Sequence, residues 1–228
     1  MFKNLMKRNF SFSAPTKFQN KAYINGEFVN AASGNTFGTY NPADESIICE
    51  VADAGNEDVE RAVAAARNAF DHGPWRTFSG HERGKYLYRL ADLIGQNAEE
   101  LASLEALDNG KHATIAHAAD INLVERQIRQ YAAWADKFMG EVAPIHGPYF
   151  QFTRKEAIGV AAQIIPWNFP ALMMAWKIGP ALATGCTTIV KPAEQTPLSA
   201  LRIAELIHEA GFPAGVVNVL PGQGNIGA

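Results

Sequence analysis

The stretch that decides the fold is residues 160–194, which read VAAQIIPWNFPALMMAWKIGPALATGCTTIVKPAE. It opens with an apolar run over 160–165 that predicts a buried strand, and a turn rich in proline follows at 166–170. A mostly apolar helix is predicted next, followed by a second buried strand over 187–191. Further along, the pattern predicts another helix over 197–210 and a third strand over 216–220. Strands that alternate with helices predict a parallel sheet.

This order predicts one half of a doubly wound, Rossmann-like α/β domain, in which ligands bind beyond the carboxyl ends of the strands. Those ends carry Pro166-Trp167-Asn168, then Lys191-Pro192-Ala193-Glu194, then a Gly-rich loop at 221–224. An ammonium group donates hydrogen bonds and a carboxylate accepts them, so Lys191 and Glu194 suit the hydroxyls of a ribose. The alternative is that both are ordinary surface residues of a loop.

Composition narrows the class of protein. The chain has 228 residues, of which 47% are hydrophobic and 19% charged, as in ordinary globular proteins. A net charge of -3 argues against a nucleic-acid partner. No apolar run approaches the roughly 18 residues needed for a membrane span. Two cysteines do not make a disulfide framework, which indicates a reducing compartment.

The first residues have the composition of a targeting segment. Residues 1–26 contain five basic residues and no acidic ones, with apolar residues at helical spacing. This composition is typical of a mitochondrial transit peptide, here assigned to residues 1–20, and predicts a location in the mitochondrial matrix. The alternative is a basic tail on a cytoplasmic protein.

Three further regions follow this segment. Residues 21–140 are expected to form strands and four helices that belong to the cofactor domain. The strands include a hairpin around Asn25-Gly26 and a short strand over 47–51. Ser79 and Glu82 form a capping-box pattern at the start of the second helix, and the third helix is expected to end near Gly110. A single long helix is expected over 114–139, with Phe138 buried. Residues 141–159 predict a projecting hairpin that could pair with another subunit. Residues 160–228 form the nucleotide-binding half, in which the strand at 216–220 is expected to leave an open sheet edge.

The sequence offers no convincing nucleophile and no metal site. Cys49 and Cys186 both lie in apolar surroundings, so both are expected to be buried and unreactive, and no charged group is adjacent in sequence to Cys186. The six histidines are scattered, and His112 and His117 are five residues apart, on different faces of a helix. The GxGxxG letters at 222–227 are interpreted as a Gly-rich loop, because no helix follows them.

Long stretches of the chain resemble the aldehyde dehydrogenase superfamily, and most closely its NAD-dependent mitochondrial and retinal-oxidising class. They cover nearly all of residues 21–224 and read YINGEFV, NPADESIICEVADA, EDVERAVAAARNAF, LADLIGQNAEELASLEALDNGK, GVAAQIIPWNFPALMMAWKIGPALATG, IVKPAEQTPLSAL and EAGFPAGVVNVLPG. The resemblance implies oxidation of an aldehyde to a carboxylic acid with NAD as cofactor, by proteins that form homo-oligomers.

The resemblance also implies roles for individual residues. Asn168 matches the asparagine that donates to the aldehyde oxygen as negative charge develops there, and Lys177 matches a lysine thought to help remove a proton. Phe169, Met173 and Trp176 match the apolar wall of the substrate tunnel. The residues expected along the cofactor are Ile164, Ile165, Pro166, Trp167, Asn168, Lys191, Glu194 and Gly224. A 2′-phosphate would clash with Glu194, which favours NAD over NADP.

Family members continue past this point with a phosphate-binding helix, a glutamate base and a cysteine nucleophile. The chain is therefore expected to be an N-terminal fragment without the catalytic domain. Two alternatives stay open: a non-catalytic protein that binds a nucleotide, and an interaction protein that joins oligomers of longer relatives through residues 149–154.

Overall fold

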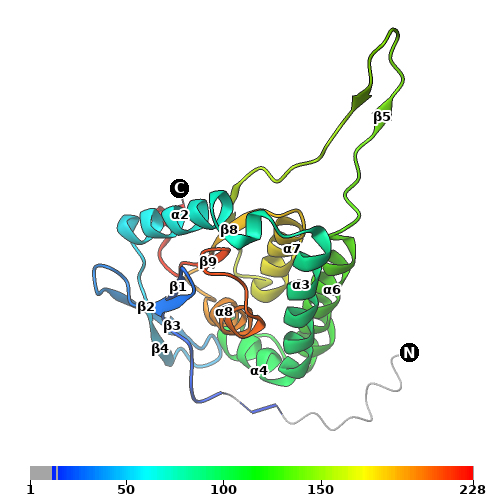
Figure 1. Ribbon diagram of the computed structural model, residues 1–228. Helices are drawn as coiled ribbons and strands as arrows, with labels where there is room; N and C mark the ends of the chain where they lie inside the picture. The colour runs from blue at the N-terminus through cyan, green and yellow to red at the C-terminus, as the bar shows by residue number, and fades with distance from the viewer. Residues whose placement is uncertain (1–11, 14, 228) are drawn as a thin grey trace, which may run out of the picture.

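The computed structural model describes residues 12–13 and 15–227. Most of the predicted targeting segment, residues 1–11 and 14, lies outside the described residues. Two segments that are far apart in the described chain form one mixed sheet, because a strand near its beginning hydrogen-bonds to a strand near its end (Figure 1).

The central sheet has five strands in the order β2-β1-β9-β8-β7. Strands β7 (Val160–Ile164), β8 (Thr187–Lys191) and β9 (Val217–Val219) are parallel, as the sequence predicts. Strands β1 (Ala22–Ile24) and β2 (Glu27–Val29) extend the sheet in antiparallel fashion beyond β9. The carboxyl ends of the parallel strands therefore meet at one edge, where β7 is paired with β8 through Ile164 and Lys191.

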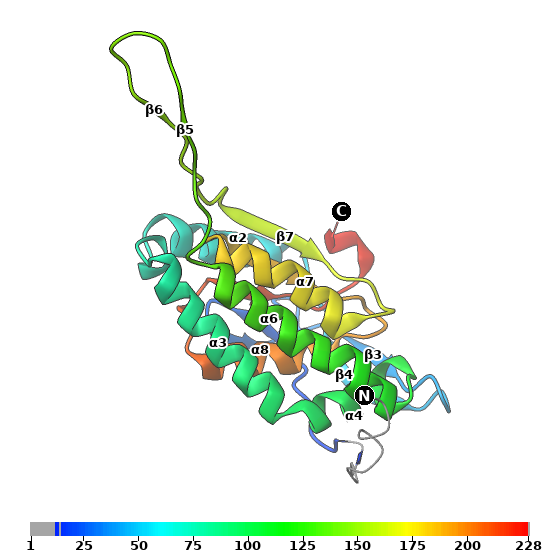
Figure 2. The same cartoon turned by 90° about the vertical axis from the view of Figure 1, so that its right-hand side faces the viewer.

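Helices cover both faces of the sheet (Figures 1 and 2). Side chains alternate along a strand, so Ile189 packs in the cluster with α2 (Asn56–Asp71), whereas Val190 packs in the larger cluster with α7 and α8. Helices α7 (Pro170–Ala183) and α8 (Leu198–Ala210) are nearly continuously apolar where they meet this core. Three more helices pack outside them: α3 (Gly80–Gln96), α4 (Ala98–Asn109) and α6 (Asn122–Trp134).

Two strand pairs lie outside the central sheet. Strands β3 (Thr36–Tyr40) and β4 (Ile47–Ala52) form one antiparallel pair, of which the sequence predicted only the second strand. Strands β5 (Val142–Ala143) and β6 (Gln151–Phe152) form the predicted hairpin, which stands well away from the body of the molecule (Figure 2).

Two local predictions are confirmed. The Asn25-Gly26 turn between β1 and β2 has positive φ at both residues, 53° and 83°, as a two-residue hairpin with native twist requires. Helix α3 begins with the predicted capping box: Ser79 Oγ accepts from the backbone N–H of Glu82, and the Glu82 carboxylate accepts from the backbone N–H of Ser79.

The predicted open edge was placed wrongly. The strand at 216–220 is not an edge strand, because β9 pairs with β8 on one side and with β1 on the other. Strand β1 occupies the position beside β9 that was predicted to be empty. The edge on that side of the sheet is instead β2, and β7 is the edge on the opposite side, where Ile164 is 53% exposed.

The single long helix predicted over 114–139 is confirmed in part: residues 113–134 are helical without a break, but one stretch is π-helical and the helix ends at Trp134. The chain forms a short helix α5 (Ala113–Ile115), a π-helical segment η2 (Ala116–Ile121) and then α6, which ends at Trp134. The spacing of apolar residues in the sequence does not reveal the wider π-helical turn. Phe138, expected to be buried, lies beyond the end of α6 and is 39% exposed.

Two short 3-10 helices complete the elements. Segment η1 (Pro74–Arg76) follows α2, and it buries Trp75, whose indole N–H donates to the carbonyl of Cys186 at 3.2 Å. Segment η3 (Gly224–Gly227) takes the place of the predicted Gly-rich loop.

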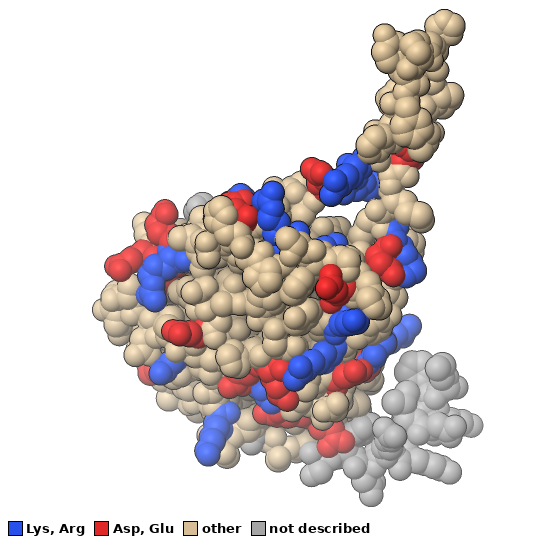
Figure 3. Space-filling model, in the orientation of Figure 1, with Lys and Arg blue, Asp and Glu red and all other residues tan. Residues whose placement is uncertain are grey.

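Positive and negative side chains are interspersed on the face seen in Figure 3, whereas the outer part of the hairpin carries neither. Across the described residues, no helix has both the length and the apolar character to traverse a bilayer.

Candidate functional site at the carboxyl edge of the sheet

The charged pair predicted to hold a ribose lies where β8 ends. Lys191 is the last residue of β8 and is 7% exposed, with its Nζ 2.8 Å from Oε2 of Glu194. This hydrogen bond holds the pKa of the Glu194 carboxyl below its usual range, so the group is ionised at neutral pH. The side chain of Glu194 is 31% exposed, which leaves its oxygens accessible to a ligand.

The turn after β7 lies beside this pair. The backbone N–H of Ile165 donates to the carbonyl of Lys191 at 2.9 Å, which holds the start of the turn against the end of β8. Ile165 is buried, whereas Pro166, Trp167 and Asn168 are exposed. The structure therefore brings the predicted cofactor residues of two neighbouring strands together at one edge.

Lys177 lies on α7 and is tied to β7. Its Nζ donates to the carbonyl of Ile164 at 2.5 Å, and its own carbonyl accepts from the Gln163 side chain at 2.9 Å. The ammonium group therefore lies at the end of β7, next to the turn that carries Asn168.

The residues predicted to line the substrate wall begin at the same turn. Phe169 precedes α7 and is 38% exposed, and Trp176 on α7 is 47% exposed. Met173 is half-buried between them and packs against the main core. Their spacing of four and three residues places them on one side of the helix.

Gly224 begins η3, and nothing lies within 4 Å of the place where a Cβ would be, so the surroundings of this residue are open. Three residues later, a Cβ on Gly227 would come within 3.3 Å of Ile164 and 3.6 Å of Lys191. The segment η3 therefore lies against the end of β7 and β8.

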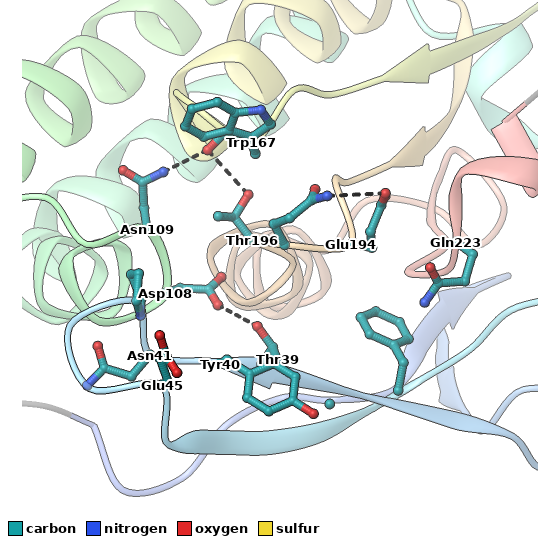
Figure 4. A pocket seen from close by; sticks show the side chains of 14 residues that line it. Thr39, Tyr40, Asn41, Glu45, Asp108, Asn109, Trp167, Glu194, Thr196 and Gln223 are labelled. Atoms are coloured by element: carbon teal, nitrogen blue, oxygen red, sulfur yellow. Dashed lines mark hydrogen bonds between the residues drawn. The ribbon is translucent and has the colours of Figure 1, made fainter.

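A cavity of about 770 Å³ borders this edge (Figure 4). Trp167 and Glu194 reach it from the predicted site, and the other walls come from the β3 region and the end of α4. Its volume is within the range of pockets that hold small ligands. The residues that line it are Phe37, Gly38, Thr39, Tyr40, Asn41, Pro42, Glu45, Asp108, Asn109, Trp167, Glu194, Gln195, Thr196 and Gln223.

Several of these residues were not predicted as part of the site. Asn109 Nδ2 donates to the carbonyl of Trp167 at 2.7 Å, and the Thr196 hydroxyl donates to the same carbonyl at 3.4 Å (Figure 4). Asn109 precedes the bonded residue by 58 positions. The sequence marked the end of α4 by its glycine, but no local pattern indicates which distant carbonyl the asparagine meets.

Cys49 lacks the environment of a nucleophile, and Cys186 is buried. Burial, with smaller contributions from Asp108 and Glu50, raises the pKa of the Cys49 thiol to about 11. Cys49 is half-buried rather than fully buried as expected. Cys186 is 4% exposed. Its neighbours in sequence carry no charge, but Arg83 from α3 lies close enough in the folded chain to interact with it electrostatically.

The described residues contain no group of three or more histidine, cysteine or acidic side chains that could hold a metal ion. The fold and the site together define an α/β protein with a parallel half-sheet and a charged pair at its carboxyl edge.

Comparisons with known proteins give the family. The aldehyde dehydrogenase family model matches residues 28–228, and the chain therefore belongs to the aldehyde dehydrogenase family. It is 54% identical over 211 residues to the mitochondrial aldehyde dehydrogenase of Rattus norvegicus, covering 92% of this chain and 41% of that protein. It is 53% identical over 218 residues to a putative aldehyde dehydrogenase of Bacillus subtilis, covering 96% of this chain and 43% of that protein.

Solved structures agree with this assignment. An aldehyde dehydrogenase from Bacillus cereus superposes with a TM-score of 0.91 at 50% identity, covering 96% of this chain and 45% of that one. A complex of a Bacillus cereus aldehyde dehydrogenase with NAD+ superposes with a TM-score of 0.89 at 54% identity, covering 90% of this chain and 42% of that one. The chain thus spans about two fifths of the length of these relatives.

Proposed function

We propose that this chain is the cofactor-binding and oxyanion-holding part of an NAD-dependent aldehyde dehydrogenase, which oxidises an aldehyde to a carboxylic acid. The observation that carries the proposal is the Lys191–Glu194 ion pair at the carboxyl edge of β8, in a chain of this family. Parallel strands place ligands at this edge, and the pair offers both a donor and an ionised acceptor there.

The residues at this edge fit a nucleotide. Glu194 would accept hydrogen bonds from the ribose hydroxyls, and Lys191 would donate one while holding the carboxylate in place. Ile164, Ile165, Pro166 and Trp167 would lie along the cofactor. Gly224 would lie near the adenine, and its open surroundings are consistent with that role. When bound, NAD accepts the hydride that leaves the aldehyde carbon.

The turn after β7 would hold the reacting oxygen. The side-chain amide of Asn168 would donate to the aldehyde oxygen as negative charge accumulates on it, which stabilises the transition state more than the ground state. Lys177, whose ammonium lies at the end of β7, would assist proton removal. Phe169, Met173 and Trp176 would provide an apolar wall for the organic part of the aldehyde.

The nucleophilic step is not assigned to either cysteine of this chain. A thiolate is required to attack an aldehyde, and a thiol with a pKa of about 11 is almost entirely protonated at neutral pH. We therefore assign cofactor binding and oxyanion stabilisation to these residues, and leave the attack to a group outside them.

The test is nucleotide binding by the 228-residue chain, measured by calorimetry with NAD+ and NADP+. We expect NAD+ to bind more tightly than NADP+. Because a hydrogen bond to a charged group contributes about 1.5–3 kcal/mol, Glu194→Gln should weaken NAD+ binding roughly 10- to 100-fold. Glu156→Gln, an exposed acidic residue at the root of the hairpin, is the matched control. Equal NAD+ affinity for the wild-type chain and Glu194→Gln would refute the proposal.

A second role, association with other subunits, is favoured by the β5–β6 hairpin. Four large apolar side chains on it are more than 60% exposed, namely Val142, Tyr149, Phe150 and Phe152. Hydrophobic side chains gathered on one projecting element mark an interaction site. We expect Phe150→Ser to lower the mass measured by light scattering, whereas Ile115→Ser, at an equally apolar but separate exposed site, should not. A wild-type chain that has the mass of a monomer would contradict this role.

The proposed location is the mitochondrial matrix, from the basic composition of residues 1–26. Fusing residues 1–20 to a fluorescent protein tests it directly. Diffuse cytoplasmic fluorescence would favour the cytoplasmic alternative.

A further inference from the structure

The turn that carries Asn168 is contacted by the last residue of α4 and by a residue just after that helix. On one side, Asn109 Nδ2 donates to the carbonyl of Trp167 at 2.7 Å. On the other side, Lys111 Nζ lies 4.0 Å from the centroid of the Phe169 ring. Both residues flanking Asn168 in the chain are thus contacted by residues only two positions apart.

Gly110 makes this double contact possible. It has a φ of +81°, which ends α4 in the left-handed conformation and turns the chain sharply. A Cβ at this position would also lie 2.8 Å from the ring of Pro42. Asn109, before the glycine, and Lys111, after it, therefore both contact the same turn.

Lys111 is itself held by buried carboxylates. Its Nζ is 2.5 Å from Oδ2 of Asp120 and 3.9 Å from Oε1 of Glu105. The two acidic side chains are 2% and 0% exposed, and the lysine side chain is 19% exposed. The two carboxylates therefore hold the ammonium group in a place largely removed from water, which strengthens its attraction to an aromatic face.

Glu105 adds to the demand for a cation at this place. Burial raises the pKa of its carboxyl to about 7, an effect that the Ser199 hydroxyl and the Lys111 ammonium oppose. A neutral side chain at position 111 would leave both Glu105 and Asp120 without this ammonium. The two carboxylates thus tie Lys111 to the protein core, and Lys111 contacts Phe169 in the turn after β7.

We propose that Lys111 is a positioning residue: pinned by Asp120 and Glu105, it holds Phe169 through its ring face and so orients the neighbouring Asn168 toward the reacting oxygen. The inference rests on the proposed role of Asn168 in the site. It predicts that the orientation of the Asn168 amide depends on a cation at position 111, and not merely on a side chain that fills the space.

The test uses NMR of the 228-residue chain, with the Asn168 side-chain amide assigned by its loss in Asn168→Asp. Lys111→Met retains the aliphatic stem and removes the charge, whereas Lys111→Arg retains the cation. We expect the order parameter of the Asn168 side-chain amide to fall to below about 0.6 in Lys111→Met, and to recover in Lys111→Arg. Lys85→Met, at an exposed lysine on α3, is the control and should change nothing.

A second signal reports the contact itself. Protons on the Cε of Lys111 should be shifted upfield in the wild-type chain by the Phe169 ring, and Phe169→Leu should abolish that shift and loosen the Asn168 amide while leaving the ion pairs of Lys111 intact. This variant keeps the proposal testable if Lys111→Met does not fold.

An equally ordered Asn168 amide in the wild-type chain and Lys111→Met, at equal melting temperature, would overturn the proposal, as would equal loosening in Lys111→Met and Lys111→Arg. The measurement uses no nucleotide. Failure of NAD+ to bind would therefore refute the proposed function and leave these signals unchanged, so the two failures can be told apart.

Discussion

Replacing Asp108 tests whether one buried carboxylate joins three elements of the fold. Asp108 is 3% exposed and lies at the end of α4. One of its oxygens accepts from the backbone N–H of Leu198 at 2.9 Å, at the start of α8, and the other accepts from the hydroxyl of Thr39 on β3 at 3.0 Å. The carboxylate thus satisfies a donor at a helix N-terminus, where negative charge is favoured.

Asp108→Ala leaves both donors without a partner. Loss of a capping interaction costs about 0.5–2 kcal/mol, and a buried donor left unpaired costs about 1–3 kcal/mol. We therefore expect the free energy of unfolding to fall by about 2–4 kcal/mol. In Asp108→Asn, the amide oxygen can still accept from Leu198, and the amide nitrogen can donate to the Thr39 hydroxyl. This variant should retain both bonds without the charge.

The dependence on pH separates the two variants further. Burial raises the pKa of Asp108 from 3.8 to about 7, so between these values the folded chain holds a proton that the unfolded chain has lost. Stability therefore decreases as pH rises from about 4 to 7, by up to about 4 kcal/mol for a shift of about three units. Glu105 contributes a change of the same sign. This contribution is slightly smaller in Asp108→Asn, because the Asp108 charge is the last of the causes that raise the pKa of Glu105, and this adds to the difference between the two chains.

The assay is urea unfolding followed by tryptophan fluorescence at pH 5 and pH 8. We expect the wild-type chain to lose at least about 2 kcal/mol more than Asp108→Asn between these two pH values. The reasoning is refuted if Asp108→Ala unfolds within about 0.5 kcal/mol of the wild-type chain, or if Asp108→Asn shows the same loss with pH as the wild-type chain.

Three other predictions follow from single features. Ser79→Ala removes the capping box of α3 and should lower the free energy of unfolding by about 1 kcal/mol, measured in urea; no change would contradict the importance of the box. Because burial raises the pKa of Cys49 to about 11, iodoacetamide should alkylate it on the order of hundreds of times more slowly at pH 7.5 than a free cysteine, and mass spectrometry of the native and urea-unfolded chain measures this. The 228-residue chain should form no NADH with an aldehyde, because burial raises the pKa of the Cys49 thiol and Cys186 is only 4% exposed; steady NADH formation that Asn168→Ala abolishes would defeat this.

Local chemistry was enough for much of the fold and for part of the site. Apolar runs and breaker residues predicted the three parallel strands and helices α7 and α8. The Asn25-Gly26 dipeptide predicted the hairpin. These features depend on residues close together in the chain. The same order of elements placed Lys191 and the turn before Asn168 at one edge of the sheet, because parallel strands share the direction of their carboxyl ends.

Tertiary structure alone decided how distant segments complete that edge. No local pattern indicates that β1 pairs with β9, which makes β2 rather than 216–220 the edge strand on that side of the sheet. Nor does any local pattern indicate that Lys111 lies against Phe169, since the two residues are far apart in the chain and meet only in the folded structure. Pairing and packing between segments far apart in the chain are set by the free energy of the whole core, whereas a sequence pattern records only the preferences of neighbouring residues.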